Sequence, residues 1–145
     1  MPVVGSPEAL LAIEAALRAY LLEDVALAAL IGTRIYPVVM PQKPDLPAVT
    51  YLRVTGSRVH SNDGPSGLSS PRFQFDCWAL TYLGARAVAE ALRLRLDGFK
   101  GLIGGSPARH DIQGVFFETE REFYESETKL YRHSGDYFIH YRESV

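Results

Sequence analysis

Three side chains that lie close together in the sequence are of the types that hydrolases use. His60, Asp63 and Ser66 fall within one short stretch, and a histidine beside a carboxylate can activate a serine hydroxyl for nucleophilic attack. The stretch lacks the Gly-x-Ser-x-Gly spacing of an α/β-hydrolase, because Ser66 is followed directly by Gly67. It also offers no second layer of groups to hold the three in place. We therefore expect no catalytic residues and no enzyme, and keep a small hydrolase as the last of the alternatives.

The other histidines, acids and the cysteine do not combine into a catalytic or metal site. His133 and His140 are seven residues apart in one predicted strand, so their side chains face opposite sides of a sheet. Asp136 shares a face with His140 but lies four residues away, which is about 13 Å along a strand. Cys77 is the single cysteine, which excludes an intrachain disulfide and a cysteine-based metal site. We expect no cofactor and no metal, and an inert buried thiol at Cys77.

One strand followed by one helix forms the nucleus of the predicted fold. Along Arg72–Leu80, apolar side chains alternate with polar ones, which is the period of a half-buried strand. From Thr81 to Asp97 the apolar residues recur at helical spacing, with Thr81 as a capping residue and Gly98 suited to a left-handed conformation after the last turn. A strand and a helix that each have one apolar side must cover each other or a neighbour.

The remaining patterns complete an α+β fold in one domain, residues 1–145. A helix begins at Ser6-Pro7 and lies beside the main helix or on a neighbouring subunit, and a short turn at Val25–Leu30 ends at Gly32. Further strands are predicted at Val49–His60, His110–Arg121 and Lys129–Arg142, the last two joined across Glu122–Thr128, and a short one could occupy Arg34–Val39. Lys100–Pro107 is typical of a glycine-rich linker. We expect a mostly antiparallel sheet of four to five strands with the main helix packed on one face.

Composition and charge narrow the classes of function. The chain has 145 residues, of which 47% are hydrophobic and 22% charged, with eight tyrosines and seven phenylalanines. That aromatic content is typical of a folded domain and argues against disorder. A net charge of −2 argues against a protein that holds nucleic acid on a broad basic surface. Glu14 and Arg18 interrupt the longest apolar stretch, Ala9–Leu22, so we expect neither a signal peptide nor a membrane span.

The charges are unevenly distributed along the chain. Six acids stand against Arg121 and Lys129 between positions 111 and 129, which gives that segment a charge of −4 and leaves +2 on the remainder. The acidic segment could bind a divalent ion, but a hairpin that faces solvent or a partner is the better interpretation. Two differently charged surfaces on one molecule suit head-to-tail contacts that close a ring.

Several sequence runs carry a resemblance to a known family. They are DGPSGL at Asp63–Leu68, RFQFDCWALTY with the Ala/Arg/Leu-rich helix that ends in DGF, GTRIYPVVMPQ, LPAVTYLRV, and IQGVFFETEREFYESETKLYRHSGDYFIHYRE. Together they resemble the tail-completion, or tail-terminator, proteins of long-tailed phages and prophages, which were long catalogued as a domain of unknown function. The likeness extends across nearly the whole chain, and it leaves open a phage, a prophage or a gene transfer agent as the source.

The resemblance implies a structural role in the virion tail, assembled in the host cytoplasm. Such a protein would form a ring, sixfold as in the family, that caps the head-proximal end of the tail tube and ends polymerisation of the major tail protein. Its implied partners are copies of itself, the major tail tube protein and a head–tail connector protein, with DNA passing only transiently and no membrane. Another head–tail connector, such as a stopper or adaptor ring, is the first alternative.

Two segments are the expected contact surfaces. One is the long connection Ser61–Ser70, since long loops are often functional, with a mobile loop of turn-forming residues as the equal alternative. The other is the acidic hairpin, which is also a candidate for the wall of a DNA channel, because a neutral or acidic wall would let DNA slide without adhering. The expected interface residues are Asn62, Asp63, Ser66, Leu68, Glu118, Glu120, Glu122, Glu125 and Glu127.

Overall fold

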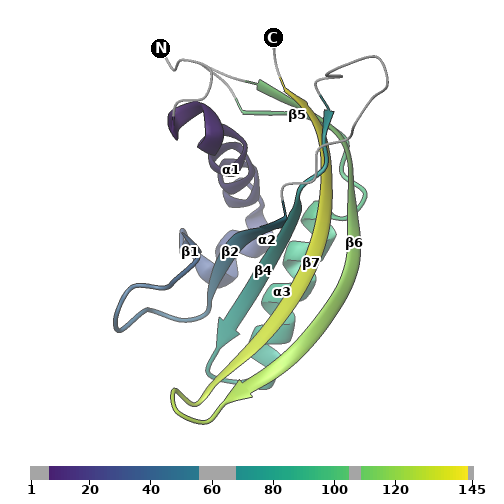
Figure 1. Ribbon diagram of the computed structural model, residues 1–145. Coiled ribbons are helices and arrows are strands. Elements are labelled where there is room, and N and C mark those ends of the chain that lie inside the picture. The colour runs from purple at the N-terminus through teal and green to yellow at the C-terminus, as the bar shows by residue number, and fades with distance from the viewer. Residues whose placement is uncertain (1–6, 56–67, 105–108, 144–145) are drawn as a thin grey trace.

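A computed structural model describes residues 7–55, 68–104 and 109–143 of the chain (Figure 1). Within these ranges the chain forms three helices, which are α1 (Pro7–Leu22), α2 (Val25–Ile31) and α3 (Tyr82–Leu96). The strands in the same ranges are β1 (Ile35–Pro37), β2 (Ala48–Thr55), β3 (Leu68–Ser69), β4 (Arg72–Ala79), β5 (Gly101–Gly104), β6 (Arg109–Glu125) and β7 (Leu130–Glu143). The α+β class is as predicted.

The sheet is larger than predicted and, as predicted, mostly antiparallel, with one parallel pair. Its order is β1-β2-β4-β7-β6-β5, and β3 pairs with β7 outside this path, which makes seven strands in the described ranges. The expectation of four to five strands was therefore wrong. β1 pairs with β2 in parallel, and the other pairs are antiparallel. The proline-rich segment between β1 and β2 is the crossover that a parallel pair requires.

β5 lies inside the segment predicted to be a linker, which is a second correction. Its four residues pair with β6 from Gly101 opposite Ile112 to Gly104 opposite Arg109. Glycine has a low strand propensity, and Ile103 contributes the single buried side chain of this strand. So short a segment gives no period that could have identified it.

The β6–β7 hairpin is also longer than predicted. The last pair is Glu125 with Leu130, so Glu122 and Glu125 belong to the strand rather than to the connection. The register shifts between Phe117 and Thr119, which is the mark of a bulge in β6. β2 is described as far as Thr55, and the rest of the predicted strand, residues 56–60, lies outside the described residues.

The helix α3 confirms the prediction made from its caps and apolar period. The hydroxyl of Thr81 accepts a hydrogen bond from the Gly84 amide at 3.0 Å, and Gly98 has a φ of 80°. Five buried side chains line one side of the helix: Ala85, Val88, Ala89, Leu92 and Leu96. They pack on Phe73, Phe75 and Cys77, which alternate along β4 as expected.

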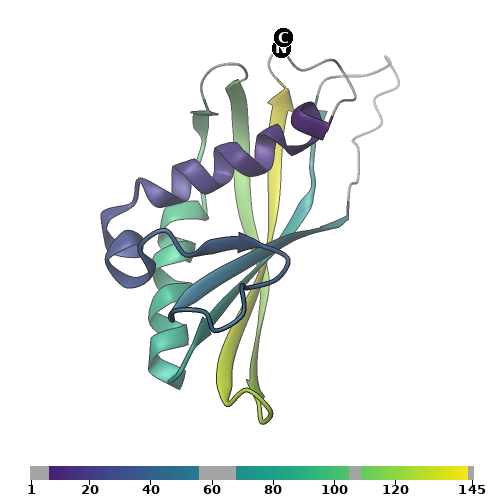
Figure 2. The same ribbon diagram turned by 90° about the vertical axis from the view of Figure 1, so that its left-hand side faces the viewer.

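The N-terminal helix lies on the same face of the sheet as α3, in the same chain (Figure 2). Arg95 of α3 donates to the carbonyl of Tyr20 at 2.8 Å, and the Tyr20 hydroxyl donates to the carbonyl of Arg95 at 3.0 Å. The Arg95 guanidinium also lies 3.8 Å from the centre of the Tyr20 ring. Both helices thus close one apolar core, and no described helix covers the other face, which we call the helix-free face.

Candidate interaction surface

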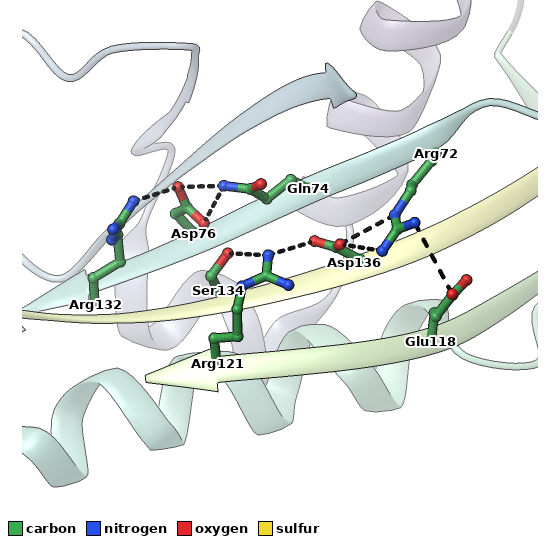
Figure 3. Close-up of polar contacts among 8 residues, drawn as sticks. All are labelled: Arg72, Gln74, Asp76, Glu118, Arg121, Arg132, Ser134 and Asp136. Carbon is green, nitrogen blue, oxygen red and sulfur yellow. Dashed lines mark hydrogen bonds and ion pairs between the residues drawn. The ribbon is translucent and has the colours of Figure 1, made fainter. Parts of the chain in front are cut away.

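The helix-free face carries a charged network instead of a second apolar layer (Figure 3). The alternation that buries Phe73 and Phe75 turns their neighbours outward on the opposite side of β4. β6 and β7 contribute in the same way, so three strands meet in one plane of polar groups. Its members are Arg72, Gln74 and Asp76 from β4, Glu118 and Arg121 from β6, and Arg132, Ser134 and Asp136 from β7.

Asp136 is the centre of the first half of this network. Its Oδ2 accepts hydrogen bonds from Nη2 and Nε of Arg72 at 2.7 and 3.1 Å, and its Oδ1 accepts one from Nη2 of Arg121 at 3.1 Å. The residue is only 3% exposed, and both arginines lie on that side of the sheet (Figure 3). Two guanidinium groups therefore compensate a carboxylate that has lost its water.

Asp76 and Arg132 form the second half. The carboxylate of Asp76 accepts two hydrogen bonds from the Gln74 amide at 3.0 and 3.1 Å and lies 3.6 Å from Nη1 of Arg132. The Arg132 guanidinium stacks between two rings, 5.3 Å from the centre of Trp78 and 4.4 Å from that of Phe123. Such stacking holds a planar cation in one orientation.

The network as a whole is nearly neutral and has a fixed pattern of charge. Three arginines stand against four carboxylates, since Glu118 lies 4.0 Å from Arg72 and Glu125 lies 3.9 Å from Arg132. Paired charges held in this way contribute little net stability, but they discriminate between partners and between registers of docking.

The five acids predicted as one surface are divided by the pleat of the hairpin. Glu118 and Glu125 lie on the helix-free face, while Glu120 and Glu122 lie on the helix side. Glu120 is 3.9 Å from Arg86, and the Glu122 carboxylate beside the Tyr82 hydroxyl raises the pKa of that phenol. Glu127 is exposed in the turn. The hairpin therefore does not present one continuous acidic surface.

The predicted loop surface is described only at its end. Asn62, Asp63 and Ser66 lie outside the described residues, as does His60. The backbone of Leu68 belongs to β3 and pairs with Arg142 of β7. The contact role of these residues stays a prediction, and so does the role of the hydrolase-like set.

A cavity of about 180 Å³ lies between α3 and the β4–β7–β6 part of the sheet. His133 lines it and is 5% exposed; its Nε2 is 3.1 Å from Oε2 of Glu120 but is not oriented for a hydrogen bond.

As predicted, His133 and His140 lie on opposite faces of the sheet, and the His140 ring hydrogen-bonds the Ser70 hydroxyl on the helix-free side. Burial raises the pKa of the Cys77 thiol far above its ordinary value. No three metal-ligating side chains gather anywhere in the described ranges.

A family model for tail completion protein gp17 matches residues 15–142, which is most of the chain. The chain belongs to this family. It is accordingly a structural component of the virion tail. Within the ranges that the structure describes, no helix of this tail completion protein has the length and apolar character needed to cross a bilayer.

The structural comparison agrees on the fold of this tail completion protein. A solved chain described as part of the virion of a native gene transfer agent particle superposes with a TM-score of 0.74, at 20% sequence identity. The match covers 92% of this chain and 96% of that one. At that identity the likeness shows the fold alone. No curated protein matches the sequence.

The sequence reasoning missed an exposed apolar cluster at the hairpin end of this tail completion protein. Leu80 and Leu83 are 67% and 76% exposed, and Tyr82 beside them makes an edge contact with Tyr131, their ring centres 6.2 Å apart. Tyr124 packs on the same ring at 4.8 Å and is itself half exposed. The one available signal was the pair of leucines that flank the helix cap, since neither fits the buried stripe of the helix.

Proposed function

We propose that this tail completion protein forms a ring, sixfold as the family resemblance implies, at the head-proximal end of the tail tube. The ring ends polymerisation of the major tail protein and offers the surface to which the head connector docks. The observation that carries the proposal is the match to the tail completion family over residues 15–142. The structure adds support, because the charged helix-free face and the exposed apolar cluster around Tyr82 and Leu83 are two distinct surfaces for contact with other proteins.

The helix-free face supports a role in docking against a neighbouring subunit or the tube. Asp136 and Asp76 are almost fully buried by arginines in the isolated chain, so this charge pattern exists before any partner arrives. Preformed charge pairs add specificity at little entropic cost. The exposed cluster around Tyr82 and Leu83 lies on the helix side and offers a second, apolar contact area.

We further propose that DNA passes through the ring along a wall that is neutral or acidic. A row of unpaired arginines or lysines would bind phosphates and hold the DNA. In the acidic hairpin, Glu118, Glu120 and Glu125 lie near arginines, so the exposed Glu122 and Glu127 are the strongest candidates for this wall. A ring structure with a dense basic collar in the channel would refute this part of the proposal.

The test is to assemble tail tubes from the major tail protein with and without this protein. Capping predicts tubes of limited length, with density at one end in electron micrographs, whereas tubes without the protein should grow indefinitely. Binding to the connector on the portal side, with no effect on tube length, would favour a stopper or adaptor instead. A monomer whose hydrolytic activity disappears in Ser66→Ala would favour the hydrolase.

A further inference from the structure

We infer that the outer edge of β6 binds an extended, basic segment of another protein as an added β-strand. The inference goes beyond capping, since it concerns how the molecule holds a second chain, and it stands whether or not the ring forms. Strand addition of this kind draws its affinity from main-chain hydrogen bonds and its specificity from alternate side chains.

The first observation is that the side of β6 facing away from β7 has no neighbouring strand along more than half of its length. β5 pairs with β6 from Arg109 to Ile112 and no further. Two more backbone groups on the outer side of β6 already have hydrogen-bond partners. The Val115 carbonyl accepts a hydrogen bond from the Gly98 amide at 2.9 Å, and the Phe117 amide donates one to Asp97 at 3.1 Å. Beyond Phe117, no described residue hydrogen-bonds to the outer side of β6, which forms the margin of the sheet in Figure 1.

The second observation is which backbone groups this edge presents. The amide of Ile139, opposite Val115, donates to the Pro71 carbonyl, so Val115 and Ile139 form a pair whose own hydrogen-bonding groups point away from each other. After the bulge, alternation places the outward N–H and C=O groups on Glu120, Glu122 and Tyr124. Three successive donor–acceptor pairs, spaced for an added strand, therefore face outward in the described part of the chain.

The third observation is the charge along this edge. From Glu118 to Glu125 there are four glutamates and one arginine. Glu122 has no cationic partner among the described residues, and Tyr124, which packs on Tyr131 and is 53% exposed, lies two residues further along. An added strand with lysine or arginine at alternate positions would place its cations beside Glu120 and Glu122 and one of them near Tyr124.

This charge also argues against a second copy of β6 as the occupant. An antiparallel β6–β6 pair about a twofold axis that uses these outward groups would bring Glu122 opposite its own copy, or Glu120 opposite Glu122 of the other chain. Like charges placed directly opposite destabilise a strand pair. Charged side chains can also serve only to keep an edge from aggregating, which predicts that no strand binds at all. The experiment below separates these outcomes.

The test uses the isotopically labelled full chain and a nine-residue peptide in which lysine alternates with threonine and valine. A peptide with glutamate in place of lysine is the matched control, and a lysine peptide methylated on its backbone nitrogens is the second. Of the three peptides, we expect only the unmethylated lysine peptide to slow amide hydrogen exchange at Glu120, Glu122 and Tyr124, on the order of tenfold or more. The amides of Arg121 and Phe123, which face β7, should change little.

Two variants make the test specific. Glu122→Pro removes one outward donor while leaving the ladder to β7 intact, and should abolish peptide binding. Glu120→Gln with Glu122→Gln keeps the backbone and should weaken binding by about tenfold, whereas the remote Glu23→Gln should not. Equal binding of both peptides, no binding, or protection far from β6 would overturn the inference. Concentration-dependent protection of these same amides without peptide would identify a second copy as the occupant, and would also overturn it.

Discussion

The two faces of the central sheet are built from the same strands but by opposite means. On the helix side, Phe73, Phe75 and Tyr137 lie under α1 and α3 and are at most 2% exposed. On the helix-free side, Asp76 and Asp136 are nearly as buried, yet the groups that cover them are the arginines of neighbouring strands. A residue can therefore be inaccessible in this fold either because helices cover it or because ion pairs do.

The two faces therefore have different roles: apolar packing on the helix side determines the fold, and the charge pattern on the helix-free side is available for recognition of a partner. Apolar burial on the helix side removes water from large side chains and supplies most of the stability. The ion pairs opposite lose in desolvation much of what they gain in attraction, so their value is a fixed pattern of charge. Substitutions on the two faces should consequently differ in kind as well as in size.

The largest expected loss of stability follows from a substitution on the helix side of the sheet. Phe75→Ala should lower the free energy of unfolding by about 3–5 kcal/mol, because it removes a buried ring that packs edge-on against Tyr137 at 5.6 Å. Urea denaturation measures this change. The control is Leu94→Ala, at a position that is 70% exposed, for which we expect about 0.5 kcal/mol or less. Equal losses in the two variants would remove the distinction between core and surface.

Next in size is the removal of the central carboxylate on the helix-free face. Asp136→Ala leaves two arginines facing each other without their anion and should cost about 1–3 kcal/mol, less than a fully buried pair because both arginines are partly exposed. The same denaturation experiment applies. If Asp136→Ala cost as much as Phe75→Ala, the helix-free face would be part of the core after all.

A smaller effect is expected where an arginine stacks on rings. Arg132→Lys keeps the charge near Asp76 but loses the planar contact with Trp78 and Phe123, which should cost about 0.5–1.5 kcal/mol. Arg109→Lys, at an exposed position in β6, is the matched control and should be neutral. A neutral Arg132→Lys would show that only charge matters on this face.

The smallest effect concerns an acid on the helix side. Partial burial raises the pKa of Glu14, and the positive charge of Arg53 opposes the rise. The folded protein therefore binds this proton more tightly than the unfolded chain, and its stability falls as the pH rises through the raised pKa. Glu14→Gln should remove that loss, gaining on the order of 0.5 kcal/mol or less at pH 7 and nothing at pH 3. A gain that is the same at both values would contradict the assignment.

The parts of the fold that were predicted are those that the local sequence specifies. β4 and α3 followed from an alternation, a helical period and two caps, all within residues 72–98. The short strand predicted at Arg34–Val39 is present as β1, but its parallel pairing with β2 was not predicted and β5 was missed. Both depend on partners that the local sequence does not indicate. The bulge after Phe117 could not be predicted either, although it decides which glutamates share a face.

The charged network could not be predicted from the sequence either, because its members come from strands that are distant in the chain. Arg72 and Asp136 were each correctly placed on the polar side of a strand, but they are 64 residues apart and meet only through the register of β4 on β7. The acidic segment was visible as a cluster in the sequence, and the pleat then divided it between two faces. Local patterns predict which way a side chain points, and only strand pairing decides what it meets.

The most direct test of the central claim is cryo-electron microscopy of tails assembled with this protein. We predict a ring of copies at the head-proximal end of the tube, in which the helix-free face around Asp136 is covered by a neighbouring subunit or by the tube. Tails that carry no such ring, or a ring whose helix-free face is open to solvent, would contradict the account.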